Sequence, residues 1–253
     1  MKTGLLFLVA ILLFKNRCEA SADTAAVKQF RHIIQLIESD NVTELSKLIV
    51  YPLRRENPLP DIKNSDDFVA HYQLLFDDSL KNLLKRYDDS DVFEHQDSYG
   101  LVGGGFTGEI WIDEDGKISA INYSSKEEQK AKQILVDKIK KEMYPTVNSW
   151  DENVLVAQSK KLLIRVDRTD KGLRYVCWSN RRTIKDSPDI VLYKGIDEAK
   201  GTQGGWTWTF KNGDWTYIVD DAELYEETKD CGLFLELLFK GELKSKTKLT
   251  ETK

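Results

Sequence analysis

The chain has 253 residues, with 37 Lys and Arg against 42 Asp and Glu, a net charge of -5 and a pI near 5.4. This balance argues against a nucleic-acid-binding protein, because such proteins gather basic residues on one face. The length suits one large domain or two small ones. Beyond residue 22 no apolar run is long enough to cross a membrane as a helix.

The first 22 residues are typical of a signal peptide. Lys2 precedes an apolar run over residues 5–14, and residues 20–22 (Ala-Ser-Ala) supply the small side chains that a signal peptidase reads. We therefore expect cleavage after Ala22 and export to the periplasm or the extracellular space. Cys18 would be the site of a lipid anchor, but the Lys-Asn-Arg before it does not fit a lipid-attachment sequence, which favours a protein without an anchor.

Helical periodicity dominates the part of the chain before residue 145. Apolar residues recur at the spacing of an amphipathic helix in the stretches 27–37, 45–49, 68–75, 80–84 and 131–139. Residues that favour N-caps precede the later helices: Asn41, Asn64 or Ser65, Asp77 or Asp78, and Ser125 followed by Glu128. Pro145 ends the last helix, because proline cannot continue one.

Residues 103–108 match the G-x-G-x-x-G pattern of a dinucleotide-binding loop. In such a loop the last glycine opens a helix. Here residues 109–113 alternate polar and apolar side chains, a Glu-Asp-Gly turn follows at 114–116, and residues 118–123 alternate again. We therefore predict a β-hairpin at this position and no dinucleotide cofactor.

Short strands make up the second half of the chain. Strand-forming stretches recur at residues 162–167, 173–178, 189–193, 206–210, 215–219 and 234–239, and Asn212-Gly213 is a strong hairpin signal. The Lys-rich end, residues 240–253, is typical of a frayed polar tail. Helices first and strands later predict an α+β fold, with an α+β domain over residues 23–145 and an all-β antiparallel barrel or sandwich over residues 146–253.

No motif for catalysis or metal binding is present in the sequence. The histidines, His32, His71 and His95, lack metal-ligand spacing, and the nucleophile and phosphate-loop motifs are missing. We predict no metal and no cofactor. Cys177 and Cys231 would remain after signal cleavage, and they either form one disulfide or stay as separate thiols.

One candidate ligand-binding group lies on the second-half hairpin. Trp206 and Trp208 share one face of a strand, and Trp215 lies on the partner strand. Such aromatic faces bind sugar rings and flat ligands. They also fill the interior of small barrels, which need bulky residues, and this favours the core interpretation.

A second candidate group comes from the first half: Arg54, Arg55, His71, Tyr72 and Trp111. If helices wrap around the hairpin sheet, these side chains would line a cavity in which Arg54 or Arg55 binds a carboxylate or phosphate. Alternatively, the arginines pair with acids on neighbouring helices.

Two sets of segments resemble a known family. YPLRRENPLPDIKNSDDFVAHYQLLFDDSL, followed by GEIWIDEDGKISAINYSS, resembles an uncharacterised family of exported bacterial two-domain proteins. The first domain of that family is similar to the nuclear-transport-factor-2-like cone, in which helices pack on a curved antiparallel sheet. LRYVCWS, PDIVLYKG and GTQGGWTWTFKNGDWTYIVD resemble its small all-β second domain. The resemblance implies architecture and location, and it supplies no catalytic residues.

These observations predict an exported, non-catalytic binding or interaction protein of the cell envelope, whose partner is a small molecule, a glycan or an envelope protein. An alternative is an enzyme that acts on a small molecule through an Asp/His/Tyr pocket in the first domain. That enzyme would hold a buried acid within hydrogen-bond reach of His71 or Tyr72. A further alternative is an inhibitor that inserts the loop at residues 201–205 into a foreign hydrolase.

Overall fold

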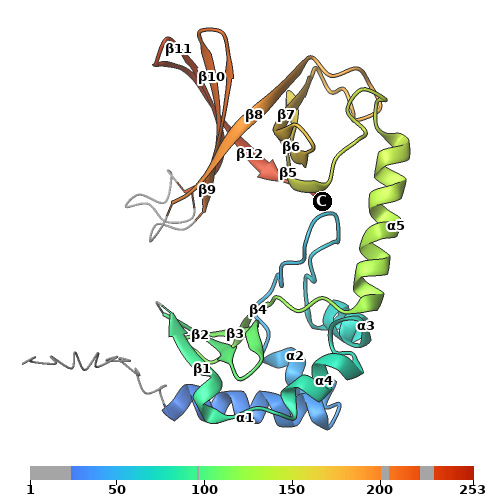
Figure 1. The fold of residues 1–253 in the computed structure, drawn as a ribbon, viewed down its shortest axis with the longest axis vertical. Coiled ribbons are helices and arrows are strands. Elements are labelled where there is room, and N and C mark those ends of the chain that lie inside the picture. Colours follow the sequence, from blue (N-terminus) through green and yellow to red (C-terminus); the bar gives the residue numbers. More distant parts are fainter. Residues whose placement is uncertain (1–23, 96, 201–204, 223–230) are drawn as a thin grey trace, which may run out of the picture. The chain divides into compact units, whose positions relative to one another are not determined.

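The computed structural model describes residues 24–95, 97–200, 205–222 and 231–253. The chain forms two compact units, each built from two stretches of sequence: Met1–Val50 with Asp78–Tyr123, and Tyr51–Asp77 with Ser124–Lys253 (Figure 1). The expected signal peptide and Cys18 lie outside the described residues. The division into an α+β domain over residues 23–145 and an all-β domain over residues 146–253 stays a prediction.

The described residues of the first unit form helices and an antiparallel sheet. The helices are α1 (Thr24–Glu38), α2 (Val42–Lys47), α4 (Asp78–Leu84) and the 3-10 helix η1 (Asp89–Asp91), and the strands are β1 (Val92–His95), β2 (Ser98–Gly103), β3 (Phe106–Asp113) and β4 (Ile118–Ile121). The strands pair in chain order. Helix α1 buries Phe30, Ile33 and Ile37, which lie on one face at helical spacing. Asn41 caps α2 as predicted, by accepting from the Glu44 amide.

The glycine-rich stretch at residues 103–108 leads into a strand, as predicted. Gly104 and Gly105 turn the chain between β2 and β3, and both have positive φ. β3 then pairs with β4 through partners such as Ile110 and Ile121, and Gly116 lies in the turn between them with φ 73. Because a strand follows the last glycine, this stretch does not have the geometry of a dinucleotide-binding loop.

The second unit combines two helices with a barrel. The helices are α3 (Ser65–Leu75) and α5 (Lys126–Glu142), and the strands are β5 (Glu152–Gln158), β6 (Leu162–Thr169), β7 (Gly172–Ser179), β8 (Ile190–Ala199), β9 (Trp206–Asn212), β10 (Trp215–Ala222), β11 (Gly232–Phe239) and β12 (Glu242–Glu251). These strands form a closed antiparallel barrel in the order β10-β11-β12-β5-β6-β7-β8-β9, with β8 between β7 and β9 (Figure 1). The α+β class is confirmed, and the all-β part is a barrel.

The expectation of a frayed tail at residues 240–253 is wrong, because most of this stretch forms β12. β12 pairs with β11 along its length and with β5 through Thr250 and Glu251, which closes the barrel. Its side chains are mostly polar and exposed, and Leu249 is its one buried residue. The strand therefore lacks the apolar alternation by which a strand is recognised in a sequence.

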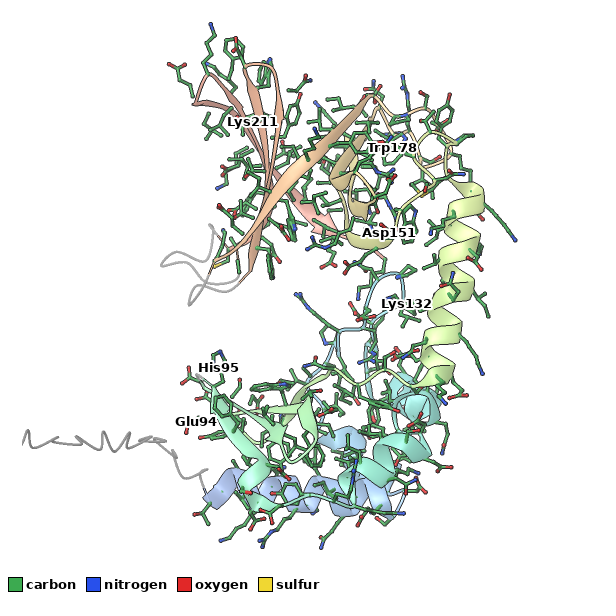
Figure 2. The ribbon with its side chains drawn as sticks, in the orientation of Figure 1. Glu94, His95, Lys132, Asp151, Trp178 and Lys211 are labelled. Carbon is green, nitrogen blue, oxygen red and sulfur yellow. The ribbon has the colours of Figure 1, made fainter. Side chains whose placement is uncertain are left out.

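Strand β7 is buried on both faces, which explains its continuous apolar sequence. Tyr175 and Cys177 point into the barrel and belong to its core. Val176 and Trp178 belong to a second cluster outside the barrel, together with Val136 of α5. Figure 2 shows Trp178 on the side of the barrel wall where the C-terminal end of α5 lies. Helix α5 is thus anchored to the barrel by apolar packing.

Candidate ligand-binding site

An apolar pocket of about 310 Å³ lies between α3 and α5 in the second unit. Its walls are mainly aliphatic, with side chains from the segment before α3 and from both helices: Leu59, Ile62, Leu74, Leu75, Ile134 and Leu135. Arg55, Glu128 and His71 supply its polar groups. Sites for small ligands are usually apolar pockets of about 300–1,000 Å³, so this pocket lies at the lower end of that range.

Arg55 and Glu128 form a buried ion pair in the wall of this pocket. The Arg55 Nε donates to Glu128 Oε1 at 2.7 Å, and Nη2 donates to Oε2 at 2.6 Å. Both side chains are buried, and a buried charge requires a partner of this quality. Arg55 therefore pairs with an acid on a helix, which was one of the two alternatives for the arginines. The charge of Arg55 is neutralised within the protein.

Glu128 was recognisable from the sequence only as a helix-capping residue. Its backbone amide donates to Ser125 Oγ at 3.0 Å, which starts α5 as the cap pattern predicts. Its carboxylate, however, goes to Arg55, 73 positions earlier in the chain. Capping patterns concern neighbours in sequence, so this long-range partner carries no local signal.

His71 lines the same pocket from α3 and is half-buried. Its Nδ1 lies 2.7 Å from the Asp67 carbonyl oxygen, one helical turn earlier. A carbonyl oxygen can only accept, so Nδ1 carries the hydrogen and Nε2 is an acceptor in the neutral ring. His71 is thus oriented by its own helix.

Tyr72 and Trp111, the other members of the predicted group, lie elsewhere. Tyr72 is buried and stacks on Phe76 at the end of α3, with ring centroids 5.1 Å apart. Trp111 belongs to β3 in the first unit, where its Nε1 donates to the Gly108 carbonyl at 3.0 Å. The side chains that the sequence suggested for one cavity therefore lie in several different places.

Arg54, Trp206 and Trp208 line a second pocket, of about 300 Å³, at one end of the barrel. Trp206 is 45% exposed there, whereas Trp208 is 6% exposed and belongs to the barrel core. Trp215 lies at the other end of the hairpin, where its ring centroid is 5.0 Å from that of Phe239. The core interpretation is confirmed for Trp208, and Trp206 is left as an exposed aromatic surface.

Cys177 and Cys231 are both free thiols in the structure, so the disulfide alternative is not realised. Cys177 faces the barrel core, and burial raises the pKa of its thiol above the ordinary value, an effect that a hydrogen bond with Tyr175 partly offsets. Residues 201–204, most of the loop considered for an inhibitor, lie outside the described residues.

The part of the chain that the structure describes contains no group of three or more His, Cys, Asp and Glu residues placed to hold a metal ion. None of its helices has both the length and the apolar character needed to cross a membrane.

Comparisons with protein-family models, with curated proteins and with solved structures find no match to this chain.

Proposed function

We propose that this protein is a non-catalytic binding protein that takes a small, largely apolar molecule into the pocket between α3 and α5. The observation that carries the proposal is the aliphatic lining of this 310 Å³ pocket. A molecule that leaves water for such a pocket gains roughly 25 cal/mol for each Å² of apolar surface that becomes buried.

The polar groups of the pocket restrict the ligand further. The Arg55 charge is already neutralised by Glu128, so the pocket has no need of a ligand anion. The Nε2 of His71 accepts a hydrogen bond when the ring is neutral, so it suits a ligand hydroxyl group. An apolar chain or ring with one hydroxyl group matches these features best.

The enzyme alternative receives less support from the same geometry. It requires a buried acid that works with His71 or Tyr72. The buried acid that lines the pocket is Glu128, and both of its carboxylate oxygens accept hydrogen bonds from Arg55. A carboxylate held in this way is a structural ion-pair partner and a poor general base.

The proposal includes the location and architecture that the sequence suggests. Residues 1–22 predict export, and the binding protein would act in the periplasm or outside the cell, as a component of the cell envelope. A cone-like first domain, with helices packed on a curved sheet, is the architecture that the family resemblance implies, and it remains part of the proposal.

The test is a thermal-shift titration of the purified protein with straight-chain alcohols and the corresponding fatty acids. A ligand at a free concentration of 100 times its Kd stabilises the native state by about 2.7 kcal/mol, which raises the Tm. We expect decanol to raise the Tm more than decanoate does, because Glu128 already neutralises the one arginine of this pocket.

Two matched variants locate the binding. Ile134 lines the pocket and is 68% exposed, so Ile134→Gln should leave the fold intact and weaken decanol binding about fivefold, for a lost contact of roughly 1 kcal/mol. Val69 on α3 is 49% exposed and does not line the pocket, so Val69→Gln is the control. Equal effects of the two variants, or no Tm increase with any member of the series, would contradict the proposal.

A further inference from the structure

The mouth of the barrel forms a bowl built from strand ends. β5 and β9 begin at this end, and β6, β10 and β12 finish there. These strand ends supply the rim residues Glu152, Trp206, Arg168, Asp221 and Glu251, and Arg54 joins them from the segment before α3. Leu155 and Trp208 of the barrel core form its floor. Because core side chains fill the barrel below, the bowl is shallow, and barrel mouths are frequent ligand sites.

Trp206 is the large aromatic side chain at this rim that is not buried. Along β9 the alternate positions Trp208 and Phe210 are buried in the core, while Trp206 keeps 45% of its surface exposed. An indole left in water forgoes much of the stabilisation that burial would give it. An exposed indole beside a concave surface therefore indicates a stacking surface for a ligand.

The rim carries charges of both signs. Arg168 pairs with Glu152 at 3.2 Å and with Asp197 at 2.6 Å. The hydrogen bond from Arg168 holds the pKa of Asp197 below its ordinary value, so the Asp197 carboxylate stays ionised. Arg54 and Glu251 are exposed, and neither forms an ion pair with a described residue. Two guanidinium groups thus face three carboxylates around the bowl.

This combination selects one class of ligand. A purely apolar molecule would cover Arg54 and Glu251 and offer them no partner, and a phosphate would meet an excess of carboxylates. A sugar satisfies both kinds of group, because each hydroxyl donates to a carboxylate and accepts from a guanidinium. The C–H face of the sugar ring covers the indole at the same time.

We propose that the mouth of the barrel binds a saccharide, with Trp206 as the stacking surface and with Arg54 and Glu251 as partners of its hydroxyl groups. The site is separate from the apolar pocket. Arg54 and Arg55 are neighbours in the chain, but Arg54 lines the bowl and Arg55 lines the apolar pocket. Each site can therefore be disabled without the other.

The experiment uses the full protein labelled with 5-fluorotryptophan and followed by fluorine NMR. The chain has six tryptophans, and single Trp→Phe variants assign the resonances of Trp206 and Trp215. The probes are N-acetylglucosamine, its β-1,4-linked dimer, galactose and maltose, with glycerol as a polyol control. We expect at least one saccharide to shift the Trp206 resonance in a saturable manner and to leave the Trp215 resonance unchanged.

The variants decide the outcome. Trp206→Ala should weaken the binding about tenfold or more through loss of ring stacking. Trp215→Ala, which changes a tryptophan 38% exposed at the opposite end of the hairpin, should leave it unchanged, as should Ile134→Gln in the apolar pocket. Tighter binding of a disaccharide than of its monomer would support the end of a glycan chain as ligand, and equal binding would support a free sugar.

Three results would overturn the proposal. They are a Trp206 resonance that no saccharide moves at millimolar concentration, an equal shift with glycerol, and saccharide binding that survives Trp206→Ala.

Discussion

The apolar pocket between α3 and α5 and the bowl at the barrel mouth have nearly the same volume, about 310 and 300 Å³, but opposite chemistry. In the first, the charges of Arg55 and Glu128 neutralise each other in the wall, and aliphatic side chains form the surface. In the second, Arg54 and Glu251 remain exposed beside an indole. In our two proposals, the ligand class of each pocket therefore depends on which charges the protein has already paired.

The neighbouring residues Arg54 and Arg55 show the same contrast between a paired and an exposed charge. Arg55 is buried, and its guanidinium serves stability. Arg54 is exposed, and its guanidinium is available for recognition. Arg54 lines the bowl and Arg55 lines the apolar pocket, so one short segment supplies both sites.

The largest expected effect concerns the buried pair. Arg55→Ala leaves Glu128 as a buried charge without its partner, so we expect a loss of about 3–5 kcal/mol in the free energy of unfolding. Arg54→Ala should change it by less than about 0.5 kcal/mol, as is usual for exposed positions. Urea unfolding of the two variants measures the difference. The double variant Arg55→Met/Glu128→Leu should recover most of the lost free energy of unfolding. Similar losses for Arg55→Ala and Arg54→Ala would contradict the distinction between a structural and an exposed arginine.

An intermediate effect distinguishes the floor of the bowl from its stacking surface. Trp208→Phe removes part of a buried indole from the barrel core, so we expect a loss of about 1–3 kcal/mol. Trp206→Phe should cost less than about 0.5 kcal/mol, since the ring is half exposed. Thermal and urea unfolding of both variants provide the test. If Trp206→Phe cost as much as Trp208→Phe, Trp206 would be a structural residue rather than a recognition surface.

Much of this fold was predictable because local chemistry encodes it. The helix caps at Asn41, Asn64 and Ser125, the hairpin after the glycine-rich stretch and the strands around Asn212-Gly213 all follow from neighbouring residues. The same kind of signal failed for β5 and β12. β12 is polar and exposed along most of its length, and its pairing with β5 joins strands more than 80 residues apart.

The candidate sites were predictable only in part. The sequence singled out Arg54, Arg55, His71 and Trp206 as ligand-binding candidates, and in the structure each of them lines one of the two pockets. It could not separate Arg54 from Arg55, because that assignment depends on Glu128, which lies far along the chain. Rim residues such as Glu251 carry no motif at all, since strand ends become neighbours only when the barrel closes.

The smallest expected effect is a pH dependence at Cys177, in the barrel core. Burial raises the pKa of this thiol above the 9.0 of an unperturbed cysteine, and the negative charge of Asp189 adds to the shift. The unfolded chain therefore loses this proton at lower pH than the native protein does. The stabilisation from the protonated thiol is complete below the unfolded-state pKa, and it is lost as the pH rises through the folded-state pKa.

We expect the free energy of unfolding to fall more steeply above about pH 9 in the wild type than in Cys177→Ala, with Cys231→Ala resembling the wild type. Ellman's reagent gives an independent measurement on the native protein, in which Cys231 should react quickly and the buried Cys177 slowly. Equal reaction rates would show that the barrel core around Cys177 is open to solvent. If neither thiol reacts even in denaturant, the two cysteines form a disulfide. The barrel core would then differ from the one described above, in which both thiols are free.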